Sequence, residues 1–232
     1  MKFPTYKYEQ QKINEGFKFI AGCDEVGIAP LAGPVVAAAV ILDASSIGKQ
    51  RSKSKWWYRV RDSKTVNEKE REQLVEFIKD HCLDYGVGIV THETIDEINI
   101  FNAARLAMGQ SLAGLKKQPD FLFIDGPHKI KNLDVGQAAV IDGDAKILSI
   151  AAASIIAKVA RDKILCDLHE KFPVYGFTKH KGYPTKFHRS ALLTNGVSPV
   201  HRQSFTFIKQ LIKKNCSPRQ FKKIYPQLLI TI

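Results

Sequence analysis

The sequence predicts an α/β protein, with a mixed β-sheet flanked by α-helices and a small helical appendage at its C-terminal end. Two apolar runs near the start, residues 17–24 and 34–42, are joined by a short glycine- and proline-rich link that suits a hairpin. Further along, short apolar runs alternate with stretches of helical periodicity, which is typical of sheets covered by helices. The 232 residues, 44% of them hydrophobic, suffice for the core of one such domain.

Five strands are expected from apolar runs bounded by turn residues, at 17–24, 34–42, 84–90, 121–125 and 138–141. Thr65 and Glu68 resemble a capping box, so we expect a helix to begin there and to run to about Cys82. Further helices are expected within 91–117, at 149–171, from Thr185, and after Ser217-Pro218. We therefore expect a loose polar lead-in (1–16), an α/β domain (17–205) and a basic helical extension (206–232).

Acidic residues stand at the ends of three of these runs, and they are Asp24, Glu25, Asp125 and Asp144, here called the acid cluster. A single acid at a strand end is most often a cap or a loop residue. Three strand ends sharing this feature favour a common site, provided that the strands are neighbours in one sheet. Carboxylates so close together need a cation or a proton between them, and a hard divalent metal such as Mg²⁺ prefers oxygen ligands.

The net charge is +12, from 35 Lys and Arg against 23 Asp and Glu. Such an excess favours a polyanionic partner such as nucleic acid, although a solvated basic surface is the alternative. The basic loop 44–64 contains Trp56, Trp57 and Tyr58. These aromatic side chains either stack on nucleobases or cover the core.

Four scattered cysteines without a C-x-x-C pair predict free thiols in a reducing compartment. Cys23 is expected to be a small buried strand residue. The N-terminus has no apolar segment typical of a signal peptide, and no run of 18 apolar residues could span a membrane. A cytoplasmic location is therefore expected.

The segment that holds Asp24-Glu25-Val26-Gly27 resembles the opening motif of ribonuclease HII, a type 2 RNase H. Similar motifs follow in the same order over most of the chain, from about residue 17 to 210. The matching segments are 20–27, 30–36, 62–64, 123–126, 143–144, 150–162, 175–177, 180–185 and 201–205. Each motif is short, and it is their serial order that makes the resemblance specific.

The resemblance implies an RNase H-like fold and metal-dependent cleavage of RNA within RNA–DNA hybrids. The cut falls on the 5′ side of a ribonucleotide, leaves 5′-phosphate and 3′-hydroxyl ends, and initiates the removal of ribonucleotides from DNA. By motif position, the acid cluster is catalytic and holds Mg²⁺ or Mn²⁺. Tyr183 corresponds to a residue that stacks on the deoxyribose beside the target ribonucleotide, and an ordinary turn tyrosine is the alternative.

Four further residues are candidates for substrate contacts, namely Ser63, Lys64, Ser154 and Lys158. Arg161 is expected on the same polar helical face as Ser154 and Lys158, open to the nucleic acid. The alternatives are local: Ser63 and Lys64 can simply form the turn before a helix, and Lys158 can pair with Asp162 one helical turn later. His180, His188 and His201 lack metal-type spacing, and we interpret them as structural or phosphate-near.

The substrate-gripping loop departs from the family, which normally has Gly-Arg-Gly where this chain has Gly27, Ile28 and Ala29. Ile28 removes a charged phosphate contact, and Ala29 adds a Cβ that penalises any positive φ. One interpretation is an enzyme that cuts hybrids with a weakened preference for a lone ribonucleotide. The other is an impaired loop with low activity.

Three functions follow from these features. A hybrid-specific endoribonuclease is the first, and a nucleic-acid-binding protein of the same fold with weak or lost cleavage is the second. The third is another metal-dependent nuclease such as a resolvase, which the serial order of the motifs disfavours. The expected partner is an RNA–DNA hybrid or a DNA duplex that contains ribonucleotides, and the expected state is a monomer.

Overall fold

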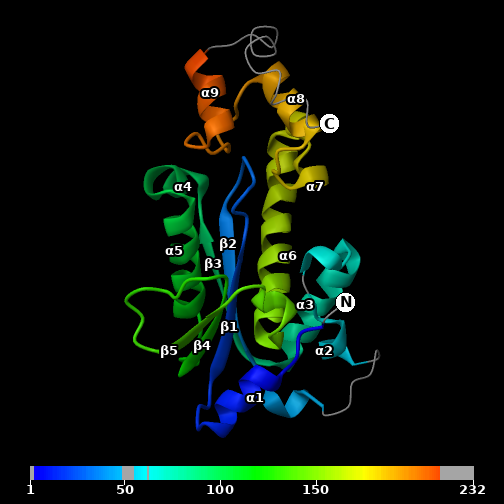
Figure 1. Ribbon diagram of the computed structural model, residues 1–232. Helices are drawn as coiled ribbons and strands as arrows, with labels where there is room; N and C mark the ends of the chain where they lie inside the picture. Colours follow the sequence, from blue (N-terminus) through cyan, green and yellow to red (C-terminus); the bar gives the residue numbers. More distant parts are fainter. Residues whose placement is uncertain (1–2, 49–54, 62, 215–232) are drawn as a thin grey trace. The chain divides into compact units, whose positions relative to one another are not determined.

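The computed structural model describes residues 3–48, 55–61 and 63–214 (Figure 1). Asp62 and the helix expected after Ser217 lie outside the described residues. Two compact units make up the described chain. Unit 1 comprises the described residues of Met1–Val26, Val36–Ile89 and Ala104–Ala160, and unit 2 comprises those of Gly27–Val35, Val90–Ala103 and Arg161–Ile232. The expected boundaries at 16/17 and 205/206 stay predictions.

Unit 1 is built around a five-stranded mixed sheet, whose strands lie in the order β3-β2-β1-β4-β5. Their bounds are β1 Ile20–Val26, β2 Val35–Leu42, β3 Cys82–Val90, β4 Phe121–Asp125 and β5 Gly136–Val140. β1 is antiparallel to β2 and parallel to β4, and β4 is parallel to β5. The mixed sheet, its hairpin and all five strands are thereby confirmed. The last strand ends one residue earlier than expected, and Ile141 is 62% exposed.

Unit 1 contains the helices α1 Lys7–Asn14, α2 Trp56–Arg59, α3 Glu68–His81, most of α5 Ile100–Ala113 and the first half of α6 Leu148–Lys171. The start of α6 lies directly on β1, because a Cβ at Gly22 would stand 2.3 Å from the backbone nitrogen of Ile150. Ile150 then packs with Phe121 and Phe123 of β4. This close approach sets the start of α6 beside the strand that carries Asp24 and Glu25.

Two expectations about the elements were wrong. The N-cap of α3 is Asn67, whose side chain accepts from the backbone N–H of Glu70, and not Thr65. The lead-in is not loose in its described part: α1 forms there, and Glu9 is only 1% exposed. A carboxylate oxygen of Glu9 accepts from the backbone N–H of Ser149, which caps the start of α6.

Unit 2 contains the helices α4 His92–Ile98, α7 Phe177–His180, α8 Lys186–Asn195 and α9 Thr206–Lys214, with the second half of α6. The helix expected from Thr185 is α8, and the Thr185 hydroxyl accepts from the backbone N–H of His188 as its N-cap. Ile208 of α9 is fully buried in the same core as Leu165 and Phe177. The first helix of the basic C-terminal region therefore contributes apolar side chains to this core. Of the described helices, none is both long enough and apolar enough to cross a membrane.

Candidate active site

Strand register brings two members of the acid cluster side by side. In the parallel pair β1–β4, Cys23 lies opposite Ile124, so the next residues along the two strands are Asp24 and Asp125. Asp24 is only 5% exposed, and one of its carboxylate oxygens accepts from the backbone N–H of Glu25 at 2.7 Å. The expectation that these strands are neighbours is confirmed.

Asp144 does not end a strand. It lies in a short 3₁₀ turn, η3 Gly143–Ala145, that follows β5. A carboxylate oxygen of Asp125 accepts from the backbone N–H of Gly143 at 2.7 Å. This hydrogen bond ties the turn to the end of β4, so the residue after Gly143 comes next to the strand-end acids.

The four carboxyl groups lie close enough together for their charges to shift the pKa values of Asp24 and Glu25. Burial raises the pKa of Asp24 well above its usual value, and the charges of Glu25, Asp125 and Asp144 raise it further. Burial raises the pKa of Glu25 to about 7, with contributions from Asp125 and Asp144. Four ionised carboxylates are therefore unfavourable here without a compensating cation.

The donor set suits a hard divalent ion, since every member offers only carboxylate oxygen. A complete coordination shell is not preassembled. Within the described part of the chain, no group of three or more His, Cys, Asp or Glu side chains stands close enough together to hold a metal ion. Asp24 and Asp125 each direct one oxygen to a backbone N–H of the protein.

Ser63, Lys64 and Ser154 lie around the acid cluster. The Ser154 hydroxyl on α6 hydrogen-bonds to Asp24 and lies 3.0 Å from the Ser63 hydroxyl. Both serines are buried, at 5% and 3% exposure, so they contact protein groups in this structure. The charge of Lys64 lowers the pKa of Glu25, whereas the charges of Asp125 and Asp144 raise it. The exposed Lys64 therefore lies near the acid cluster. Lys158 lies on α6 one turn after Ser154 and is partly exposed.

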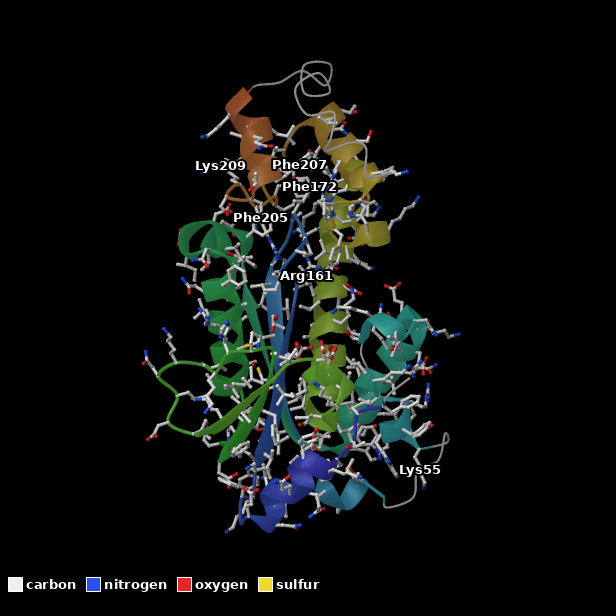
Figure 2. The ribbon with its side chains drawn as sticks, viewed as in Figure 1. Lys55, Arg161, Phe172, Phe205, Phe207 and Lys209 are labelled. Carbon is white, nitrogen blue, oxygen red and sulfur yellow. The ribbon has the colours of Figure 1, made fainter. Side chains whose placement is uncertain are left out.

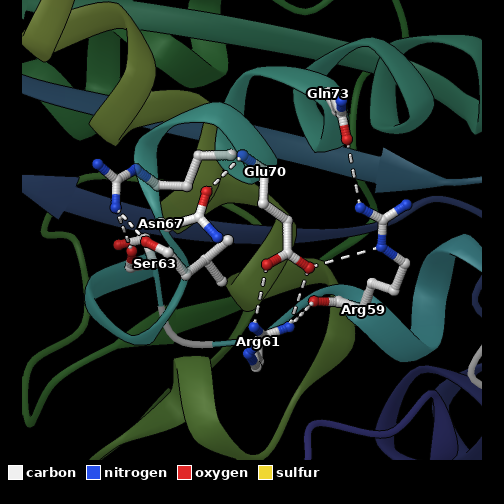
Figure 3. A network of polar contacts seen from close by, with 8 residues as sticks. Arg59, Arg61, Ser63, Asn67, Glu70 and Gln73 are labelled. Carbon is white, nitrogen blue, oxygen red and sulfur yellow. Dashed lines mark hydrogen bonds and ion pairs between the residues drawn. The ribbon is translucent and has the colours of Figure 1, made fainter.

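Two arginines of the basic segment before Ser63 form ion pairs with Glu70 (Figure 3). Glu70 of α3 forms ion pairs with Arg61 at 3.2 Å and Arg59 at 3.5 Å. An Nη atom of Arg71 donates to the Ser63 carbonyl at 3.0 Å. Trp56 is only 7% exposed, so the core-covering interpretation holds for it. Arg59 and Arg61 thus hold the segment that presents Lys64.

The substrate loop expected from the sequence lies in unit 2. Gly27 has φ +105°, and a Cβ there would stand 2.5 Å from Nε of Arg161, so glycine is required. Ile28 is partly exposed and Ala29 is exposed. Ala29 is not among the non-glycine residues with positive φ in the described chain, so its Cβ brings no strain of that kind.

Two buried arginines hold this loop, and sequence reasoning missed both roles. Arg202 donates to the carbonyls of Ile28, Gly33 and Pro34 at 3.0–3.1 Å. Arg161 donates to the carbonyls of Pro34 and Ala32, and also to that of Lys181. The helical pattern put Arg161 on a polar face open to nucleic acid, which was wrong: it is fully buried on α6 (Figure 2). Its acceptors are backbone groups distant in sequence.

Tyr183 also lies in unit 2, partly exposed, in the turn after α7. The loop and this turn are joined, because the backbone N–H of Leu31 donates to the Gly182 carbonyl at 2.8 Å. The predicted site residues therefore fall into two groups. The acid cluster, Ser63, Lys64, Ser154 and Lys158 belong to unit 1, and the loop Gly27-Ile28-Ala29 and Tyr183 belong to unit 2.

The five-stranded mixed sheet is flanked by helices and carries acids near the ends of β1 and β4. This arrangement is that of an RNase H-like protein. Residues 21–208 match the family model of ribonuclease HII. A ribonuclease HII of Paracoccus denitrificans is 45% identical over 92% of this chain and 97% of its own length. The chain belongs to the ribonuclease HII family, and it is a type 2 RNase H endoribonuclease of a class that depends on divalent metal.

Solved structures agree with this assignment. Ribonuclease H2 from Pyrococcus horikoshii has a TM-score of 0.68 and 25% identity, covering 85% of this chain and 98% of its own. An RNase HII of Archaeoglobus fulgidus, solved in complex with PCNA, has a TM-score of 0.66 and 26% identity, with coverage of 83% and 96%. The RNase H-like fold expected from the sequence is thereby confirmed.

Proposed function

We propose that the acid cluster binds the divalent ions with which this endoribonuclease cuts RNA next to DNA. The cut falls on the 5′ side of a ribonucleotide, in hybrids or in duplex DNA with embedded ribonucleotides, and leaves 5′-phosphate and 3′-hydroxyl ends. The supporting observation is geometric: the β1–β4 register sets Asp24 beside Asp125, and Asp125 accepts from the backbone N–H of Gly143, the neighbour of Asp144. The raised pKa of Asp24, to which the charges of the other three members contribute, agrees with this arrangement.

Mg²⁺ or Mn²⁺ fits this donor set, since both favour carboxylate and water oxygens. When bound, such ions supply Lewis-acid stabilisation of the leaving oxygen and an activated water. Asp24 and Asp125 each keep a second oxygen beside the one that accepts a backbone N–H. Ser154, bonded to both Asp24 and Ser63, fixes the orientation of the buried carboxylate.

The remaining predicted residues would bind the nucleic acid. Lys64 is exposed near Glu25, where an ammonium group suits a backbone phosphate, and Lys158 follows on the surface of α6. Tyr183 would stack on the sugar beside the ribonucleotide. The loop Gly27-Ile28-Ala29 would grip the ribonucleotide through backbone groups alone, so we propose a weakened preference for a lone ribonucleotide over a long hybrid.

The decisive experiment uses the full chain with Mg²⁺ or Mn²⁺ and four labelled duplexes: all DNA, all RNA, a long RNA–DNA hybrid, and DNA with one ribonucleotide. We expect cleavage of the last two only. Asp125→Asn keeps an oxygen that can accept the Gly143 N–H but loses the negative charge, so it should abolish cleavage and retain duplex binding. Full activity of this variant would refute the metal-binding role. Binding of hybrids without any cleavage would favour the second candidate, a binding protein with an impaired loop.

A cytoplasmic location and a monomeric state remain predictions. The PCNA complex of the Archaeoglobus relative suggests that docking on a replication clamp is worth testing with the described α9 and the residues beyond it.

A further inference from the structure

Three histidines that have no part in the proposed chemistry surround the turn that presents Tyr183. His188 and His201 are fully buried, and His180 is 9% exposed. The rings of His180 and His188 stack with their centroids 4.4 Å apart, and the Phe177 ring meets His188 edge-on at 5.5 Å. Burial lowers the pKa of all three, so they are neutral near pH 7.

The hydrogen bonds of His201 fix its tautomer. The backbone N–H of Ser198 can only donate, and it donates to Nδ1 of His201 at 3.1 Å; the Ser198 hydroxyl, 2.7 Å from the same Nδ1, can donate there as well. The proton of this imidazole is therefore on Nε2. Nε2 lies 3.0 Å from Nε2 of His188, to which it donates.

The tautomer of His188 follows from that of His201. Since Nε2 of His188 accepts, its proton is on Nδ1, which donates to the Tyr183 carbonyl at 2.9 Å. The direction of every bond is thus set, from Ser198 through His201 and His188 to Tyr183. We call these four residues the histidine relay.

The turn that the histidine relay reaches is strained. Lys181 has φ +48° and Gly182 has φ +84°, and a non-glycine residue in this region is unusual. The backbone N–H of Tyr183 donates to the His180 carbonyl at 2.9 Å, while its own carbonyl accepts from His188. The backbone N–H of Gly182 donates to Nδ1 of His180 at 3.2 Å. The Tyr183 N–H is therefore held by the backbone carbonyl of His180, and the Tyr183 carbonyl by the imidazole of His188.

We propose that His188 and His201 are positioning residues for substrate recognition: the histidine relay fixes the backbone of Tyr183 and so the place of its ring against the nucleic acid. This rests on the proposed function, in which Tyr183 stacks on the substrate. The side chain of a residue follows its backbone, and a misplaced positioning group lowers the rate of the chemical step. Neither histidine needs to touch the substrate.

Two carboxamide variants of His188 each keep one of its two hydrogen bonds, either the one to Tyr183 or the one to His201. Asn at 188 can place its NH₂ near the Nδ1 position, so it keeps a donor for the Tyr183 carbonyl and loses His201. Gln at 188 reaches the Nε2 position, so it keeps an acceptor for His201 and loses the donor to Tyr183. Asn is the smaller side chain and leaves the larger cavity, so packing alone predicts that Asn is the more harmful change.

The assay compares His188→Gln, His188→Asn and Tyr183→Ala with the unchanged full chain, on DNA with one ribonucleotide and with Mg²⁺ or Mn²⁺. We expect His188→Gln to lower kcat about tenfold, the cost of one hydrogen bond to a positioned backbone group, with KM little changed. His188→Asn should recover most of that loss. A rate for Asn at or below that for Gln would overturn the proposal.

Tyr183→Ala tests the proposed role of Tyr183 separately from the proposed role of the histidine relay. If it leaves the rate unchanged, the proposed role of Tyr183 fails, whatever the histidines do. If it lowers the rate and His188→Gln does not, the role of Tyr183 stands and the histidine relay is refuted.

A second measurement needs no variant. Long-range ¹H–¹⁵N imidazole spectra of the full chain should show His188 protonated at Nδ1 and His201 at Nε2. The opposite tautomer at His188 would reverse the last bond and refute the proposal even if the variants fail to fold.

Discussion

Restoring the family loop is the sharpest test of how substrate preference is set here. Ile28 is partly exposed, and its carbonyl accepts from Nη1 of Arg202 at 3.1 Å, so the backbone is already held from within unit 2. An arginine side chain at this position would add a charged group without new backbone strain. One charge-assisted hydrogen bond to a phosphate contributes about 1.5–3 kcal/mol. This predicts that Ile28→Arg raises kcat/KM on a single embedded ribonucleotide roughly ten- to hundred-fold.

The second loop position should matter less. Ala29 is exposed and does not adopt a positive φ, so glycine relieves no conformational strain there. We expect Ala29→Gly alone to change kcat/KM by less than about threefold, and the double variant to behave like Ile28→Arg.

The assay measures kcat/KM on DNA with one ribonucleotide and on a long hybrid, at two salt concentrations. The gain from Ile28→Arg should be larger on the embedded ribonucleotide and should shrink at high salt, because a phosphate contact is screened. Ile28→Met is the matched uncharged control and should leave both rates unchanged. Equal rates for the arginine and methionine variants on both substrates would refute the reasoning.

Three stability predictions can be checked by urea denaturation. The pKa of buried Glu9 is raised from 4.5 to about 7, so its protonated form stabilises the fold below pH 4.5 and that stability is lost as pH rises through 7. At pH 8, Glu9→Gln should therefore be more stable than the unchanged chain, by about 3 kcal/mol at most, and at pH 4 the two should be equally stable. A lower stability of Glu9→Gln at pH 8 would show that the negative charge itself stabilises the start of α6. Gly22→Ala should cost about 1–3 kcal/mol, since its Cβ would meet the Ile150 backbone, and an unchanged midpoint would contradict that contact. Asn67→Ala should cost about 1 kcal/mol by removing the N-cap of α3, whereas Thr65→Ala, the matched control, should cost less.

The elements that the sequence predicted well are those whose signal is local. β1, β2 and β4 are apolar runs bounded by turn residues, and α6 shows regular spacing of its apolar residues. The start of α3 was misplaced because Thr65 and Asn67 are both followed, three residues later, by a glutamate. Only the folded chain shows which of the two accepts the N–H.

The amino-acid sequence by itself determined the family, the mixed sheet and the identity of the acids, because each of these is written in short contiguous motifs. Only the tertiary structure decided how they are supported. The β1–β4 register sets Asp24 beside Asp125, and Arg161 and Arg202 hold loop carbonyls far away in the chain. The Ser198 N–H and the Tyr183 carbonyl fix the tautomers of His201 and His188. All of these contacts involve backbone groups, which every residue carries, so no residue pattern reveals them.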